Sequence, residues 1–331
     1  SAAGSPADAP DPGPGAALRI LTGAPVPAGF DAVVMQEHCR RDGDDVIVGR
    51  RPRQGENIRR AGEDVESGMA LAEPGDLLSP QKLALLAGAG IGAVEVFRKV
   101  RIGLVSTGSE LREPGEALGQ GQIYNSNRIL IRSMLKACGW AEVSDFGIVP
   151  DERDRLAAVL RQAGEVCDVV VTTGGVSGGD EDHVAAILRD SGAPLEVVRV
   201  AMRPGKPVKV GLHGGALLIG LPGNPNAALV TFRQIALPAI RVAAGLRDVG
   251  PAWSPAVAGF GCAKKPGRTE FVPVRIAERT AAGVPVLEML GRGSSASLSA
   301  MAAADGIALL PPDDEAIAPG DPLRFEPFSS V

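Results

Sequence analysis

The sequence predicts a doubly wound α/β domain, flanked by an N-terminal β-rich domain and a small, barrel-like C-terminal β-domain. Strand-like and helix-like segments alternate in the middle of the chain, which is typical of βαβ units and a mostly parallel sheet. Short apolar runs separated by Pro and Gly turns lie on both sides of that region, and this pattern favours strands. We place the parts at residues 1–16 (flexible lead-in), 17–68 (β-rich domain), 69–98 (connector), 99–248 (α/β domain) and 249–331 (C-terminal β-domain).

The flanking parts follow from short patterns. Residues 1–16 lack apolar periodicity, so we expect a flexible segment. Apolar runs at 18–21 and 32–35 favour strands of the β-rich domain, and the connector contains a predicted helix and a predicted strand, at 80–87 and 94–97. Beyond residue 250, runs such as 271–276 and 306–310 are short and helix patterns are scarce, which favours a β-domain.

The central domain has longer elements. The predicted strands are 101–105, 168–171 and 216–219, and the predicted helices are 126–138, 151–163, 182–190 and 230–246. Asp151 has the position and chemistry of a helix N-cap, and Gly164 those of the glycine that ends the same helix.

Composition excludes several classes of protein. The chain has 331 residues, 45% of them hydrophobic, and a net charge of −5, so it can bury large cores but does not suggest a nucleic-acid binder. Its four cysteines form no C-x-x-C motif, which argues against structural zinc and favours a reduced, cytoplasmic setting. The longest apolar stretch, 83–94, contains three glycines and is shorter than the roughly 20 residues of a membrane span.

Three Gly-rich loops follow predicted strands, and the carboxyl ends of parallel strands are where such sheets bind ligands. Glycines let the backbone approach a ligand closely, and hydroxyls and helix N-termini bind anions. The candidate ligand-binding residues are Thr107, Gly108, Ser109, Thr173, Gly174, Gly175, Ser177, Pro222, Gly223 and Asn224. Acids in the same loops suit Mg²⁺ shared with phosphate oxygens, and we name Glu110 and Asp182 as metal ligands. Structural strand–helix turns, with Asp182 as a helix cap, remain the alternative.

Positive charge lies close by in sequence. Arg199, Arg203, Lys206 and Lys209 surround a Pro-Gly turn, and such cations bind phosphates or an oxyanion. A solvated strand edge protected by charges explains the same pattern. The same two interpretations apply to residues 57–64.

Two familiar sequence motifs are present, but their surroundings do not fit the function that each motif normally indicates. The glycines at 88–92 follow a helix pattern and precede a strand pattern, which is the reverse of a dinucleotide-binding fingerprint. Residues 175–179 fit G-x-S-x-G, but His183 and His213 have no clear acidic partner, so a hydrolase is disfavoured.

Seven motifs then occur in order, and together they identify a resemblance. They are ILTGAPVP (20–27), GENIRRAGED (55–64), STGSE (106–110), IYNSN (123–127), TGGVS (173–177), RPGKP (203–207) and LPGNP (221–225). From about residue 14 to its end, the chain resembles the molybdopterin molybdenumtransferase family, which includes bacterial MoeA and the C-terminal domain of gephyrin.

The resemblance implies the last step of molybdenum cofactor synthesis. Family members insert molybdate into the dithiolene of adenylylated molybdopterin and release AMP in a step that depends on a divalent cation, here taken as Mg²⁺. By position, Glu110, Asp151 and Asp182 resemble the family's acids for metal or substrate, and Thr22 and Ser294 its active-site hydroxyls. Arg199 and Arg203 stand where the family often has lysine, and Lys206 matches its retained lysine.

The resemblance also implies partners. We expect a cytoplasmic homodimer in which Thr22 and its neighbours from the β-rich domain complete the cleft of a second subunit. A molybdopterin adenylyltransferase is expected to act upstream, and neither a nucleic acid nor a membrane is expected as a partner.

This chain departs from the family pattern at several points. Family members begin with a Ser-Ala-Met-Asp-Gly-Tyr-Ala-like motif whose Asp lies at the active site, and this sequence begins after that motif. Asn226 stands where a small apolar residue is expected, and His183 where Tyr is common. A second interpretation is therefore a molybdopterin-binding or scaffolding protein without turnover. A third, the related adenylyltransferase, normally lacks the flanking β-domains.

Overall fold

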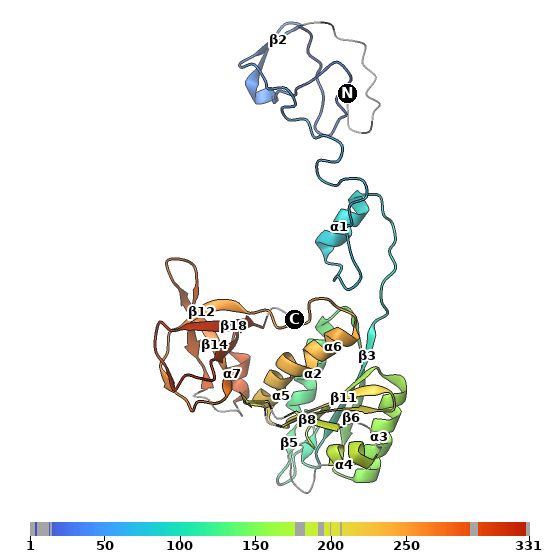
Figure 1. The fold of residues 1–331 in the computed structure, drawn as a ribbon, viewed down its shortest axis with the longest axis vertical. Coiled ribbons are helices and arrows are strands. Elements are labelled where there is room, and N and C mark those ends of the chain that lie inside the picture. Colours follow the sequence, from blue (N-terminus) through green and yellow to red (C-terminus); the bar gives the residue numbers. More distant parts are fainter. Residues whose placement is uncertain are drawn as a thin grey trace. The chain divides into compact units, whose positions relative to one another are not determined.

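A computed structural model describes residues 4, 13, 15–175, 183–190, 195–198, 200–205, 207–291 and 297–328. Most of the predicted lead-in, 1–16, lies outside these residues. The chain divides into two compact units, one formed by residues 1–71 and 80–92 and the other by residues 72–79 and 93–331 (Figure 1). None of the described helices has the length and apolar character needed to cross a membrane.

The first unit contains little regular structure. A 3₁₀ turn, η1 (Gln36–His38), leads into an antiparallel hairpin of β1 (Cys39–Asp42) and β2 (Asp45–Val48). The predicted helix at 80–87 is confirmed as α1 (Pro80–Gly88). The apolar runs at 18–21 and 32–35 form no strand, so these two local expectations were wrong. The hairpin strands consist mostly of charged and β-branched residues, and every residue of β2 is exposed.

The second unit is built on a six-stranded sheet in the order β6-β3-β7-β11-β10-β8. The strands are β3 (Val100–Thr107), β6 (Ala141–Val149), β7 (Val169–Thr173), β8 (Leu195–Val198), β10 (Val208–His213) and β11 (Ala216–Leu221). The pairs β6–β3, β3–β7 and β7–β11 are parallel, whereas β10 runs antiparallel to both of its neighbours. A short parallel pair, β4 (Leu111–Arg112) and β5 (Ile123–Tyr124), follows the first strand. The predicted doubly wound, mostly parallel sheet is confirmed.

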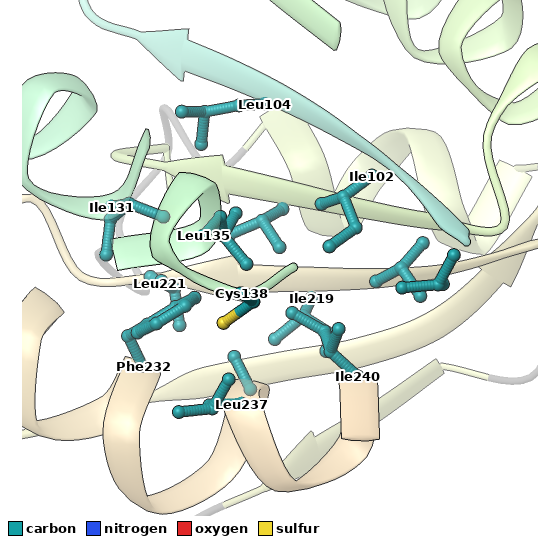
Figure 2. Packing of buried hydrophobic residues seen from close by; sticks show 14 of the residues in the cluster. Ile102, Leu104, Ile131, Leu135, Cys138, Ile219, Leu221, Phe232, Leu237 and Ile240 are labelled. Atoms are coloured by element: carbon teal, nitrogen blue, oxygen red, sulfur yellow. The ribbon is translucent and has the colours of Figure 1, made fainter. Parts of the chain in front are cut away.

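Helices cover both faces of this sheet (Figure 1). On one face lie α2 (Ser126–Ala137), α5 (Pro225–Thr231), the π-helix η2 (Phe232–Ala236) and α6 (Leu237–Ala243); on the other lie α3 (Arg153–Val166) and α4 (His183–Asp190). Figure 2 shows Phe232 beside Leu221 of β11, in the same buried cluster as Leu135 and Ile219. Leu156 and Leu188 are likewise fully buried on the opposite face. Apolar side chains spaced for one helix face therefore determine the two layers.

Three local expectations are corrected. Residues 94–97 form no strand, and the helix predicted from residue 230 begins earlier, at Pro225. Helix α3 continues through Gly164 to Val166. A Cβ added to Gly164 would lie 2.6 Å from the backbone oxygen of His213, so this glycine allows close packing inside the helix rather than ending it.

The C-terminal part is a closed five-stranded barrel, as predicted. Its strands follow the order β15-β12-β18-β16-β14, and β14 pairs with β15 to close the sheet. They are β12 (Ser254–Ala258), β14 (Thr269–Arg279), β15 (Pro285–Met289), β16 (Gly306–Leu310) and β18 (Pro322–Pro327). A two-stranded sheet of β13 (Cys262–Ala263) and β17 (Ala316–Ile317) and the helix α7 (Leu298–Ala302) complete it.

Backbone pairing and an ion pair both fasten the barrel to the α/β domain. β9 (Met202–Arg203) pairs in parallel with the start of β14. Consecutive π-helix residues, Arg233 and Gln234, both donate to Glu326 of β18, over 2.8 and 2.5 Å. Arg233 and Glu326 have only 1% and 3% of their side chains exposed.

Candidate functional site

The sheet order creates a switch point between β3 and β7. From β3 the chain passes through α2 to β6 on one side, and then through α3 to β7 on the other. Connections that diverge in this way leave a crevice beyond the carboxyl ends of the two central strands, where α/β proteins bind ligands. The loops that begin at Thr107 and Gly174 lie at these ends.

The two loops pack backbone to backbone. Gly174 and Gly175 have φ angles of +89° and +64°, a region that side chains disfavour. A Cβ on Gly174 would collide with the Thr107 carbonyl oxygen, and one on Gly175 would lie 2.7 Å from Thr107 Oγ1. That hydroxyl is buried and has no hydrogen-bond partner among the described residues. Only glycine fits here, and the loops leave one polar atom to be satisfied by another group.

Asp151 contacts the first loop and does not cap a helix. Its Oδ2 accepts the Ser109 backbone N–H over 2.9 Å, and its own N–H donates to Ser109 Oγ over 3.0 Å. Helix α3 begins at Arg153, with Glu152 at the N-cap position and no side-chain cap. The predicted capping role was therefore wrong. An acid between a strand and a helix suits either role, and sequence spacing does not separate them.

The carboxylate of Glu110 lies over Gly108. Its Oε2 would be 2.5 Å from a Cβ built on that glycine, whose φ is +150°. Glu110 is exposed, so its carboxylate oxygens are accessible to a cation or a ligand.

The third loop, after β11, adjoins the second. A Cβ on Gly223 would lie 3.8 Å from the Gly174 Cα. The predicted N-cap is confirmed, because Asn224 accepts the Ala227 N–H over 3.3 Å and Pro225 occupies the first helical turn. Asn127 of α2 donates to the Gly223 carbonyl over 2.6 Å. All three predicted loops therefore meet at one sheet edge, and Asn127 is a positioning residue that sequence reasoning missed.

Arg203 lies elsewhere, in a cavity of about 390 Å³ between the α/β domain and the barrel. Because β9 runs beside β14, Arg203 is opposite Glu270, and its Nη1 lies 3.4 Å from each carboxylate oxygen. The cavity is lined by Arg203, Pro204, Asn226, Cys262, Ala263, Glu270, Phe271, Val272, Pro273, Met289 and Leu310. The sequence alone assigns no role to Glu270. Asn226 differs from the small apolar residue that the family pattern leads us to expect, but the sequence assigns it no role either.

Lys209 is buried in β10, opposite Gly220 of β11, which in turn pairs with Thr172 of β7. Only 2% of the lysine is exposed, and burial lowers its pKa to about 8. Lys209 is therefore not the solvated cation that the strand-edge interpretation expected.

Five of the predicted site residues lie outside the described residues: Ser177, Asp182, Arg199, Lys206 and Ser294. Thr22 is exposed and belongs to the other compact unit. Within the described part of the chain, no three His, Cys, Asp or Glu residues are grouped as metal ligands.

Family models match nearly the whole chain. The MoeA N-terminal region (domain I and II) matches residues 1–90, a probable molybdopterin binding domain matches 103–242, and the MoeA C-terminal region (domain IV) matches 255–328. A curated Haemophilus influenzae protein named molybdopterin molybdenumtransferase is 35% identical over 95% of this chain and 78% of its own length. The chain belongs to the molybdopterin molybdenumtransferase family.

Other relatives agree. Molybdopterin molybdenumtransferase 2 of Mycobacterium tuberculosis is 34% identical over 94% of this chain and 77% of its own length. A solved structure of a molybdopterin biosynthesis MoeA protein from Pyrococcus horikoshii has a TM-score of 0.73 and 26% identity, covering 93% of this chain and 74% of that one. Membership of the family and the three-part fold of the MoeA-type chain are thus confirmed.

Proposed function

We propose that the protein is a molybdopterin molybdenumtransferase of molybdenum cofactor biosynthesis, which inserts molybdate into adenylylated molybdopterin and releases AMP. The observation that carries this proposal is the junction of three Gly-rich loops at the switch point of the sheet, in a chain whose curated relatives bear that name. Because these relatives are transferases by name, a scaffolding role without turnover is not favoured.

The loops are suited to the phosphate end of the substrate. Because residues 174 and 175 are glycines, no side chains at these positions fill the crevice. The Thr107 hydroxyl has no hydrogen-bond partner among the described residues. A phosphate oxygen satisfies such a donor. Asp151 holds the Ser109 backbone in place, so we assign it to positioning this loop. Ser177, Pro222, Gly223 and Asn224 complete the proposed cradle.

Mg²⁺ is proposed at Glu110, with Asp182 as a second ligand. Mg²⁺ binds through one or two carboxylates together with phosphate oxygens and water, and Glu110 offers an exposed carboxylate at the edge of the crevice. When bound, the cation would neutralise charge on the phosphates. This chain's own contribution is the orientation of the Glu110 carboxylate over Gly108.

The oxyanion is assigned to Arg199 and Lys206, with Thr22 and Ser294 as hydroxyl donors. Arg203 remains a candidate, but its guanidinium already pairs with Glu270. We propose a homodimer in which Thr22 of one subunit completes the cleft of its partner, as the resemblance to the family implies. We further propose a cytoplasmic location and a molybdopterin adenylyltransferase as the upstream enzyme.

The test follows AMP release from adenylylated molybdopterin with Mg²⁺, in the presence and absence of molybdate. The proposal predicts molybdate-dependent release by the wild type. Glu110→Gln should lower the rate about a hundredfold, as expected for loss of charge stabilisation, whereas Glu142→Gln on the exposed face of β6 should not. AMP release that does not depend on molybdate contradicts the assignment.

A further inference from the structure

The cavity beside Arg203 is lined by residues other than those of the three glycine-rich loops. It lies between Arg203, Pro204 and Asn226 of the α/β domain and residues of the barrel that include Glu270 and Phe271. Its volume of about 390 Å³ falls within the range of small-molecule sites, roughly 300–1,000 Å³. Asn226 is two residues beyond the Asn224 cap, so the cavity adjoins the third loop through the first turn of α5.

The described lining of this cavity carries no net positive charge. Arg203 is the one cation among these residues, and it is paired with Glu270, whose side chain is 12% exposed. Burial, together with the nearby Glu270 carboxylate, raises the pKa of the Cys262 thiol, which therefore stays neutral. Because the Glu270 carboxylate offsets the charge of Arg203, the described lining offers no net charge that would attract a dianion such as molybdate. The cavity is instead suited to a ligand that donates hydrogen bonds.

Asn226 adds a second acceptor. The residue is 5% exposed, and its Oδ1 is buried without a hydrogen-bond partner in the described part of the chain. A buried, unsatisfied amide destabilises the fold relative to an apolar side chain. Its presence in the lining of a cavity is explained if a ligand supplies the missing N–H or O–H.

The remaining lining is apolar and suits a flat ring. Pro204, Phe271, Met289 and Leu310 line the same cavity as Glu270 and Asn226. Two acceptors in one cavity with apolar walls are suited to a heteroaromatic ring that bears N–H groups on one edge. An aminopyrimidinone has such an edge, with an amino group next to a ring N–H.

We propose that this cavity binds the pterin ring of the substrate, with Glu270 and Asn226 accepting hydrogen bonds from its N–H edge. The apolar residues contact the ring faces, and Arg203 orients the Glu270 carboxylate. The inference rests on the proposed function, because the pterin is the part of adenylylated molybdopterin that the phosphate loops do not bind.

The test is a fluorescence titration of the full chain with 6-hydroxymethylpterin, which carries the ring but neither dithiolene nor phosphate. Glu270→Gln and Asn226→Leu should each raise Kd at least about tenfold, the effect of losing a hydrogen bond to a buried polar partner. The control Glu288→Gln removes an exposed partner of Arg275 in the same barrel and should leave Kd within about twofold. Thermal unfolding establishes that each variant is folded.

Three outcomes are decisive. Weaker binding in both cavity variants, with the control unchanged, supports the proposal. The proposal is overturned if both cavity variants are folded and bind the pterin as tightly as the wild type. It is also overturned if molybdate displaces the pterin competitively. The proposed function fails separately: a wild-type chain that binds pterin in this cavity but releases no AMP refutes the transferase and leaves the cavity assignment intact.

Discussion

The sheet edge and the barrel cavity differ in how they are built. At the edge, backbone meets backbone: Gly174 packs on Thr107, and Gly223 lies beside Gly174. In the cavity, side chains from distant segments meet, and Arg203 pairs with Glu270 across 67 residues. A backbone-built site tolerates almost no added atom, whereas a side-chain site depends on the domains that bring its residues together. Substitutions in each region should therefore have different consequences.

The largest effect is expected where the barrel is fastened to the α/β domain. Arg233→Met leaves Glu326 buried without its cation, and breaking a buried ion pair costs about 3–5 kcal/mol. Urea unfolding should show this loss. The matched change Arg275→Met breaks an exposed pair and should cost less than about 1 kcal/mol. Equal losses in the two variants would show that burial of the Arg233–Glu326 pair is unimportant.

The sheet edge is tested by two glycines with the same backbone angle. Gly174 and Gly267 both have φ of +89°, but a Cβ at Gly267 meets nothing within 4 Å. Gly267→Ala should therefore cost only the conformational penalty, about 1 kcal/mol, whereas Gly174→Ala adds a collision with Thr107 and should cost about 3 kcal/mol. Similar unfolding free energies would mean that the loop relaxes freely.

Lys209 gives the stability of the sheet a pH dependence. Its folded pKa is about 8, below the ordinary lysine value of 10.5, because burial disfavours the charge. Between these values the unfolded chain binds more protons, so the stability of the wild type relative to Lys209→Met should rise with pH, by up to about 3 kcal/mol. The cost of burying the charge is fully present below pH 8. Urea unfolding from about pH 7 to about pH 10 measures it, and a difference that does not change with pH contradicts the assignment.

The smallest effect concerns the tether of the first loop. Asp151→Ala removes the acceptor of the Ser109 N–H and should cost about 1 kcal/mol. If Asp151 capped α3 instead, Ser109→Ala would be independent of it. We expect the two changes to be non-additive in a double-mutant cycle, because the residues share reciprocal hydrogen bonds.

The sheet edge could be predicted from the sequence better than the cavity, for a physical reason. Glycines and hydroxyls directly after apolar strands specify a loop locally, and strand order then brings three such loops together. Asn224 and Pro225 likewise determine the start of α5 within a few residues. Glu270 acquires its role only through the pairing of β9 with β14, which no local pattern encodes. Asp151 resembles a cap by local spacing because its true partner, Ser109, lies 42 residues away.

The most direct test of the central claim crosses one variant from each region with two probes. Thr107→Val replaces the hydroxyl at the sheet edge that has no partner among the described residues, and Glu270→Gln replaces the acceptor in the cavity. Titration with AMP and with 6-hydroxymethylpterin should show that the first variant weakens only AMP and the second only the pterin, each about tenfold. If either folded variant weakens both probes equally, or if Thr107→Val weakens the pterin and Glu270→Gln the AMP, the division of the substrate between the two regions is wrong.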